Sequence, residues 1–149
     1  MKLSKDLREF IELLNSKKVK YLIVGGYAVA YHGHPRFTGD IDFFVESSPG
    51  NASLLEDILR TFGFADLGMS KEDFLKPEQV IQLGRPPNRI DILTSISGVN
   101  FSEAWNTKTT ADFDGLPVFI ISKKFLIQNK KTVQRAQDIA DLNKISGEG

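Results

Sequence analysis

The sequence has 149 residues, a length that fits one compact domain with a buried core, so we expect a single domain over residues 1–149. Lys and Arg together number 19, as do Asp and Glu, so the overall charge gives no reason to expect non-specific binding to nucleic acid or membranes. Because the chain has no cysteine, disulfides, thiolate metal sites and a cysteine nucleophile are excluded.

The first segment predicts an amphipathic helix. Apolar residues recur at helical spacing from Leu3 to Leu14, and Ser4 can cap the start. Charged residues, among them Lys5 and Glu12, interrupt this segment, which excludes the continuous apolar run of a signal peptide or membrane span. We therefore expect a soluble, cytoplasmic protein with no membrane partner.

Two strands with a short helix between them are predicted next. Residues 21–24 form an apolar run that stops at Gly25-Gly26, which is typical of a buried strand entering a tight turn. A helix over 27–31 and a loop lead to residues 40–45, where acids alternate with large apolar residues at the start of a second strand.

The remaining elements complete a mixed α/β pattern. We expect Asn51 to cap a helix that stops at Gly63, and Ser122 to cap the first of one or two terminal helices. Strands are predicted over 80–83, 90–93 and 116–121, with a turn-rich connection between the first two of them. The fold class is α/β (α+β), a small mixed β-sheet flanked by helices.

Three acids stand out for their surroundings. Asp40 and Asp42 are two residues apart on a strand, so both side chains lie on the same face. Asp91 lies between two isoleucines on another predicted strand, and placing that strand beside the first would complete a three-carboxylate cluster. Hard oxygen ligands that close together suit Mg²⁺ or Mn²⁺, because a cation relieves their repulsion.

Gly25 and Gly26 lie between a strand and a helix, where backbone N–H groups can approach phosphate oxygens. By itself a double glycine at such a junction is weak evidence for phosphate binding, because it more often forms a simple tight turn. The order and spacing of the glycines and the acids are more specific than either motif by itself.

That order resembles the signature of the DNA polymerase β superfamily. Val24-Gly25-Gly26 is followed after thirteen residues by Asp40-Ile41-Asp42-Phe43, and later by Ile90-Asp91-Ile92. More narrowly, residues 25–29 and 32–40 look like those of minimal, stand-alone bacterial and archaeal nucleotidyltransferases, which include relatives of abortive-infection toxins and antitoxins. The tail matches the C-terminal pattern of that group at Lys130, Arg135, Asp138 and Asp141.

The resemblance implies a nucleotidyltransferase fold and an activity. The activity is transfer of a nucleoside monophosphate from a nucleoside triphosphate, such as ATP, to an acceptor hydroxyl, with release of pyrophosphate. It further implies two Mg²⁺ ions held by Asp40, Asp42 and Asp91, where Asp91 could also accept the proton of the hydroxyl. The residues implied in nucleotide binding are Gly25, Gly26, Arg36, Thr38, Lys130 and Arg135.

Several of these positions have structural alternatives. Arg36 can bind phosphate or brace Asp42 in an ion pair, and Lys130 can reach the nucleotide or belong to a solvated helix face. We favour turn or surface roles over metal binding for His32 and His34. A partly buried core position is the better interpretation of Trp105 than base stacking.

The acceptor is left open by the sequence. It can be a hydroxyl of a partner protein, the 3′ end of a tRNA, or a small molecule. A second hypothesis is a non-catalytic, antitoxin-like module that binds a nucleotide and a partner in a toxin–antitoxin pair. Because the domain is short, we expect a second copy of the chain, in a homodimer, or a partner chain to complete the acceptor site.

Overall fold

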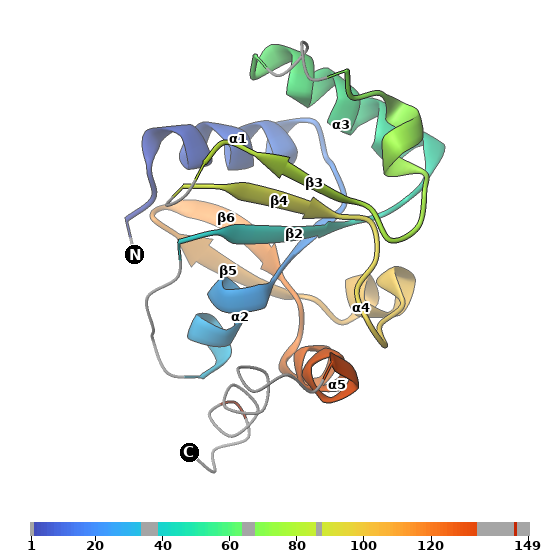
Figure 1. Ribbon diagram of the computed structural model, residues 1–149. Helices are drawn as coiled ribbons and strands as arrows, with labels where there is room; N and C mark the ends of the chain where they lie inside the picture. Colours follow the sequence, from blue (N-terminus) through green and yellow to red (C-terminus); the bar gives the residue numbers. More distant parts are fainter. Residues whose placement is uncertain (1, 34–38, 64–67, 86–87, 134–144, 146–149) are drawn as a thin grey trace.

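The computed structural model describes residues 2–33, 39–63, 68–85, 88–133 and 145 (Figure 1). Its elements in chain order are α1 (Lys5–Ser16), β1 (Tyr21–Val24), α2 (Gly25–His32), β2 (Ile41–Val45), α3 (Pro49–Thr61), the short 3₁₀ helix η2 (Lys71–Phe74), β3 (Val80–Leu83), β4 (Ile90–Leu93), α4 (Phe101–Asn106), β5 (Thr109–Phe113), β6 (Leu116–Ile120) and α5 (Lys123–Val133).

One mixed sheet organises these elements. Its six strands lie in the order β3-β4-β2-β1-β6-β5. Strand β2 pairs with two neighbours in different ways: it runs antiparallel to β1 and parallel to β4. Hairpins join β3 to β4 and β5 to β6, and β6 runs parallel to β1. The predicted α/β class with a mixed sheet and flanking helices is confirmed.

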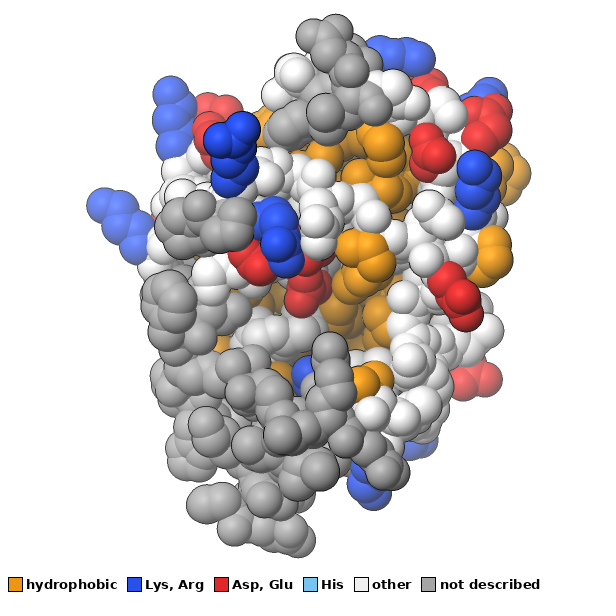
Figure 2. All heavy atoms as spheres, viewed as in Figure 1, with side chains coloured by type: hydrophobic (Ala, Val, Ile, Leu, Met, Phe, Trp, Pro, Cys, Tyr) orange, Lys and Arg blue, Asp and Glu red, His pale blue; other side chains and the backbone are white. Residues whose placement is uncertain are grey.

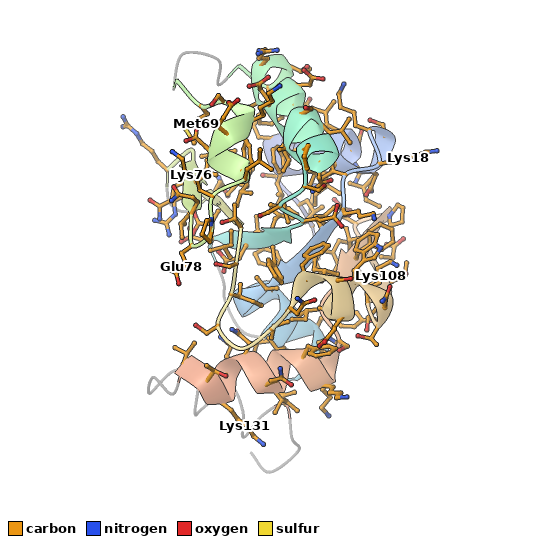
Figure 3. The ribbon with its side chains drawn as sticks, turned by 90° about the vertical axis from the view of Figure 1, so that its right-hand side faces the viewer. Lys18, Met69, Lys76, Glu78, Lys108 and Lys131 are labelled. Atoms are coloured by element: carbon orange, nitrogen blue, oxygen red, sulfur yellow. The ribbon has the colours of Figure 1, made fainter. Side chains whose placement is uncertain are left out.

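Helices cover both faces of the sheet. Helices α1 and α3 lie over one face, and α2, α4 and α5 lie on the other side (Figures 1 and 3). Successive side chains of β2 follow this division, because Phe43 packs on Phe10 of α1 and Phe44 packs on Phe101 of α4. Side chains two apart share a face, so Asp42 lies on the face of Phe44, toward α2 and α5.

The predicted boundaries hold for most elements, and one predicted cap is wrong. Ser4 caps α1 and Ser122 accepts a hydrogen bond from the backbone of α5, as expected. Helix α3, however, begins earlier than predicted, because Ser48 caps it and Pro49 occupies its first turn, where a missing N–H costs nothing. Asn51 therefore lies inside the helix.

The buried Asn51 side chain joins α3 to the sheet. Its Oδ1 accepts a hydrogen bond from Lys20 N (2.8 Å), and its Nδ2 donates to Lys20 O (3.1 Å) and Glu46 O (2.9 Å). Lys20 and Glu46 flank β1 and β2, so this amide satisfies backbone groups at the end of the sheet opposite Gly25.

Helix α4 and strand β5 were not predicted. Trp105 of α4 stacks on Phe101 and contacts Phe119 of β6 edge-on, which agrees with the partly buried core position expected for it. His32 ends α2, and its Nε2 lies 2.7 Å from Ile121 O, so this ring links α2 to the end of β6. His34 lies outside the described residues. Within the described ranges, none of the helices is both long and apolar enough to cross a lipid bilayer.

The buried amide of Asn51 gives a stability prediction. Replacing Asn51 with Leu removes three hydrogen bonds to the backbone, so we expect the free energy of unfolding in urea to fall by about 1–3 kcal/mol. The exposed Asn88 provides the matched control, and Asn88→Leu should change the unfolding free energy little. Equal losses in the two variants would contradict the structural role of Asn51.

Candidate active site

The central feature of the site is a pair of aspartates on adjacent parallel strands. Asp42 of β2 is the register partner of Asp91 of β4, and on its other side it is the partner of Val24 at the end of β1. The neighbours of each acid, Ile41 and Ile92, are buried in the core, which fixes the strands in this register. The placement of the two strands side by side agrees with the expectation from the sequence.

Gly25 makes room for the carboxylate of Asp42. Its φ is +66°, in the left-handed region that favours glycine, and a Cβ there would lie 2.1 Å from Oδ2 of Asp42. The first position of α2 therefore favours glycine for two reasons: its backbone has a positive φ, and the carboxylate of Asp42 occupies the space that a side chain would need. Val24, which precedes the helix, has an apolar side chain that cannot cap the first backbone N–H groups.

Asp42 lies in surroundings that disfavour its charged form. Burial is the largest cause, followed by the charge of Asp91, a hydrogen bond shared with Asp91 and the charge of Asp40, and together they raise the pKa of Asp42 to about 7. The positive charge of Lys130 acts in the opposite direction. Asp42 therefore binds a proton more readily than an isolated aspartate does.

Helix α5 brings Lys130 to this cluster. Lys130 is only 7% exposed, so the alternative of a solvated helix face is excluded for this side chain. The helix is docked on the turn that follows β4, where Asn129 Nδ2 donates to Ser97 O (2.9 Å). At Gly98 a Cβ would lie 2.3 Å from Oγ1 of Thr132, so the turn and the helix fit closely.

Arg89 is a site residue that the sequence analysis missed. Its Nε donates to Oδ1 of Asp91 (2.9 Å), and its second terminal nitrogen donates to Oδ2 of Asp91 (3.1 Å) and lies 2.8 Å from Oδ2 of Asp40. These hydrogen bonds and the charge of Asp91, followed by the charges of Asp40 and Asp42, raise the pKa of Arg89. The signal was its spacing, because Arg89 comes directly before β4 and is two residues from Asp91, a separation that in an extended chain places side chains on the same side.

The surface view shows the same mixture of charges. Acidic side chains lie directly beside basic ones over β2 and β4, next to a stretch of apolar side chains (Figure 2). Of the residues predicted in nucleotide binding, Gly25, Gly26 and Lys130 are described, whereas Arg36, Thr38 and Arg135 lie outside the described residues. The predicted Asp138 and Asp141 lie outside them as well.

The three carboxylates have the right chemistry for a hard divalent cation. They are oxygen ligands, two of them are register partners, and the raised pKa of Asp42 reports negative charge that a metal ion would stabilise. In the described part of the chain, however, no three His, Cys, Asp or Glu side chains are arranged as a ready metal-binding group. Arg89 holds oxygens of both Asp40 and Asp91 in this arrangement.

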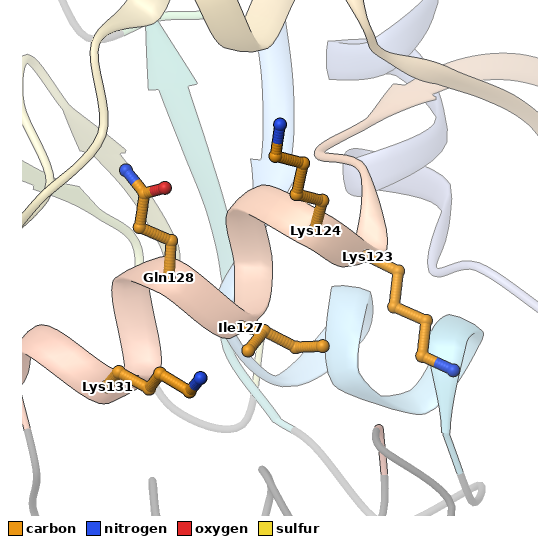
Figure 4. A pocket seen from close by; sticks show the side chains of 5 residues that line it. All are labelled: Lys123, Lys124, Ile127, Gln128 and Lys131. Carbon is orange, nitrogen blue, oxygen red and sulfur yellow. The ribbon is translucent and has the colours of Figure 1, made fainter.

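A second feature lies along α5. Among the described residues, a pocket of about 540 Å³ is lined by side chains of this helix, namely Lys123, Lys124, Ile127, Gln128 and Lys131 (Figure 4). Lys130 and the acids are not among these residues, so this pocket is distinct from the carboxylate cluster.

Comparison with known families decides the class of protein. Residues 3–148 match the model of a family described as nucleotidyl transferase of unknown function (DUF2204). The chain belongs to this family. It is thus a nucleotidyltransferase by family, as its resemblance to the polymerase β superfamily implied.

Solved structures of similar fold are consistent with this family. The protein TM1012 of Thermotoga maritima, for which a nucleotidyltransferase role has been suggested, is 16% identical with a TM-score of 0.61, and the match covers 96% of this chain and 91% of that one. The lincosamide antibiotic adenylyltransferase LnuA, bound to lincomycin, is 14% identical with a TM-score of 0.56 and coverage of 99% and 98%.

A third structure is an antigenic nucleotidyltransferase-like protein from Paracoccidioides brasiliensis. It is 18% identical with a TM-score of 0.55, and the match covers 94% of this chain and 72% of that one. At such low identities these likenesses establish a shared fold. A comparison with curated protein sequences gave no match.

The close approach of Gly25 to Asp42 gives a second prediction. Gly25→Ala forces the carboxylate of Asp42 to move and strains a backbone with positive φ, so we expect it to lower the unfolding free energy by about 1–3 kcal/mol. Gly115 also has a positive φ, but the nearest atom to an added Cβ is 3.8 Å away, so Gly115→Ala isolates the backbone cost. Chemical denaturation should show a larger loss for Gly25→Ala, and equal losses would contradict the packing role.

The pKa of Asp42 predicts how stability depends on pH without metal. An aspartate with a raised folded-state pKa binds more protons when folded than when unfolded, so stability falls as pH rises from about 4 to about 7. The contribution of this one group amounts to at most about 1.4 kcal/mol per pH unit. Asp42→Asn removes it, so this variant should be more stable than the unchanged protein at pH 8 and gain little at pH 4. Thermal melts with a chelator at both pH values measure this, and the same gain at both would contradict the raised pKa.

Proposed function

We propose that this nucleotidyltransferase is metal-dependent and transfers a nucleoside monophosphate from a nucleoside triphosphate to an acceptor hydroxyl. The acceptor oxygen forms a bond to the α-phosphorus, the bond from that phosphorus to the oxygen that bridges to the β-phosphorus breaks, and pyrophosphate leaves. The hydroxyl proton passes to a carboxylate of the cluster. The observation that carries this proposal is the register pairing of Asp42 with Asp91, with Asp40 joined to Asp91 through Arg89.

Asp40, Asp42 and Asp91 are the proposed ligands of Mg²⁺, with Mn²⁺ as a substitute and two ions expected. When bound, such ions act as Lewis acids that stabilise charge on the transferring phosphoryl group and lower the pKa of the attacking hydroxyl. The donor set supports this assignment, because all three groups are carboxylates and the most buried of the proposed ligands, Asp91, is paired with Asp42. The buried neighbours of Asp42 and Asp91 fix the register of the two strands, so the two carboxylates cannot move apart.

The chain itself supplies the binding surface for the triphosphate. Gly25 and Gly26 open α2, so backbone N–H groups of the first helical turn are available to phosphate oxygens. Lys130 places a buried positive charge near Asp42, where it also favours a bound polyphosphate. We assign Arg36, Thr38 and Arg135 to phosphate binding from the family resemblance. These residues would orient the nucleotide so that the α-phosphorus faces the acceptor.

The alternative of a non-catalytic, antitoxin-like module is not favoured. The family is described as a nucleotidyl transferase, and the three acids proposed for transfer are close to one another, with Asp42 beside Asp91 in the sheet and Asp40 linked to Asp91 through Arg89. The acceptor stays open among a partner-protein hydroxyl, a tRNA end and a small molecule. LnuA is an adenylyltransferase of lincosamide antibiotics, which supports including small molecules among the acceptors tested. Completion of the acceptor site by a second copy or a partner chain stays a prediction, which light scattering of the purified protein tests.

A transfer assay tests the proposed function. The purified protein is incubated with Mg²⁺ and each α-labelled nucleoside triphosphate, with cell extract or a panel of small hydroxyl compounds as acceptor. We expect pyrophosphate release and label on one acceptor class. Asp42→Asn should reduce the rate at least about 100-fold, because the site loses a charged ligand. Asp57→Asn changes an exposed aspartate of α3 and should leave the rate unchanged.

The acceptor class is identified by what carries the label and by salt. Label on RNA that disappears as the salt concentration rises indicates a tRNA, whereas label on a protein or a small compound excludes it. Absence of pyrophosphate release with every nucleotide, for a protein that circular dichroism shows to be folded, would falsify the proposed transfer reaction.

A further inference from the structure

Arg89 contacts two of the three acids, but the proposed transfer reaction gives it no role so far. Its guanidinium binds both oxygens of Asp91, at 2.9 and 3.1 Å, and lies 2.8 Å from Oδ2 of Asp40. Its backbone is held as well, because Arg89 O accepts a hydrogen bond from Ile41 N (3.1 Å) at the start of β2. Arg89 is therefore held in the site both by its backbone carbonyl and by its guanidinium.

The oxygens that Arg89 holds are the ones that a metal ion needs. Two of the three proposed metal ligands, Asp40 and Asp91, already have a positive charge within hydrogen-bonding distance. The planar guanidinium fits Asp91 with two parallel hydrogen bonds, which is the strongest common arrangement of arginine with a carboxylate. An incoming cation therefore meets carboxylates whose charge is partly compensated and whose lone pairs are partly used.

The three carboxylates also differ in their compensation. Arg89 lies within hydrogen-bonding distance of Asp40 and Asp91, and its charge also acts on Asp42, as does the charge of Lys130. The direct contacts of Arg89 therefore fall on Asp40 and Asp91, the two ligands at which it would compete with a divalent cation.

We propose that Arg89 is a counter-cation that holds Asp40 and Asp91 in the metal-free protein and competes with the divalent cation for them. This inference rests on the metal-dependent function proposed above. In this role Arg89 is a positioning residue that acts through the carboxylates. It keeps like charges together in the core of the sheet while no metal is bound, and it sets the metal affinity at a lower value than three free carboxylates would give.

Metal affinity of the protein without nucleotide tests this role. Mn²⁺ is titrated into each variant, and the free ion is measured by electron paramagnetic resonance. Because a competing charge at close range is removed, we expect Arg89→Gln to bind Mn²⁺ roughly tenfold more tightly than the unchanged protein. Arg89→Lys keeps the charge but loses the two-pronged contact, so its affinity should lie between the two. It also serves as the test if Arg89→Gln does not fold.

Two controls separate this proposal from the proposed function. Arg85→Gln removes an exposed arginine from the same β3–β4 connection and should leave Mn²⁺ affinity unchanged. Asp42→Asn should abolish binding. If it does, but Arg89→Gln or Arg89→Lys binds Mn²⁺ no more tightly than the unchanged protein, the role of Arg89 is wrong and the metal site stands. If Asp42→Asn binds normally, or no variant binds Mn²⁺, both proposals are overturned.

Discussion

The rest of the structure depends on two like charges held at one level of a sheet. Asp42 and Asp91 face each other across parallel strands because their apolar neighbours on β2 and β4 are buried, and a shift of one residue would turn those neighbours to the face on which the acids lie. The core therefore imposes a repulsion that neither strand can relieve alone. Such an arrangement is stable only where other parts of the chain compensate the charge. Arrangements that destabilise the fold in this way cluster at functional sites.

Three distant parts of the chain accommodate this repulsion. The turn at Gly25 leaves space for the carboxylate of Asp42, and two cations compensate the negative charge: Arg89 from the β3–β4 connection and Lys130 from the last described helix. Helices α1 and α3 lie over the opposite face of the sheet (Figure 1). The fold thus places Asp42 and Asp91 on one face and these two helices on the other.

Much of this arrangement could be predicted from the sequence, and the failures have physical causes. The strands of Asp42 and Asp91 were predictable because large apolar residues alternate with Asp42 and isoleucines flank Asp91, whereas Asp40 was expected inside a strand that begins only at Ile41. Arg89 was missed because a turn-rich connection hides the strand periodicity that begins with it. The cap of α3 was misplaced because Ser48 and Asn51 are both good capping residues and only tertiary contacts with Lys20 decide between them. The compensation of charge across elements cannot be predicted from any single segment.

The docking of α5 on the turn at Ser97 and Gly98 has a consequence for the order of assembly during synthesis. The strands that carry the acids and Arg89 emerge from the ribosome well before α5, so a growing chain can pair β2 with β4 while Lys130 is still being added. Until then the acidic cluster lacks one of its two described cations. The closing of α5 onto that turn is therefore the step at which the acidic cluster of the nascent protein acquires the second of these two cations.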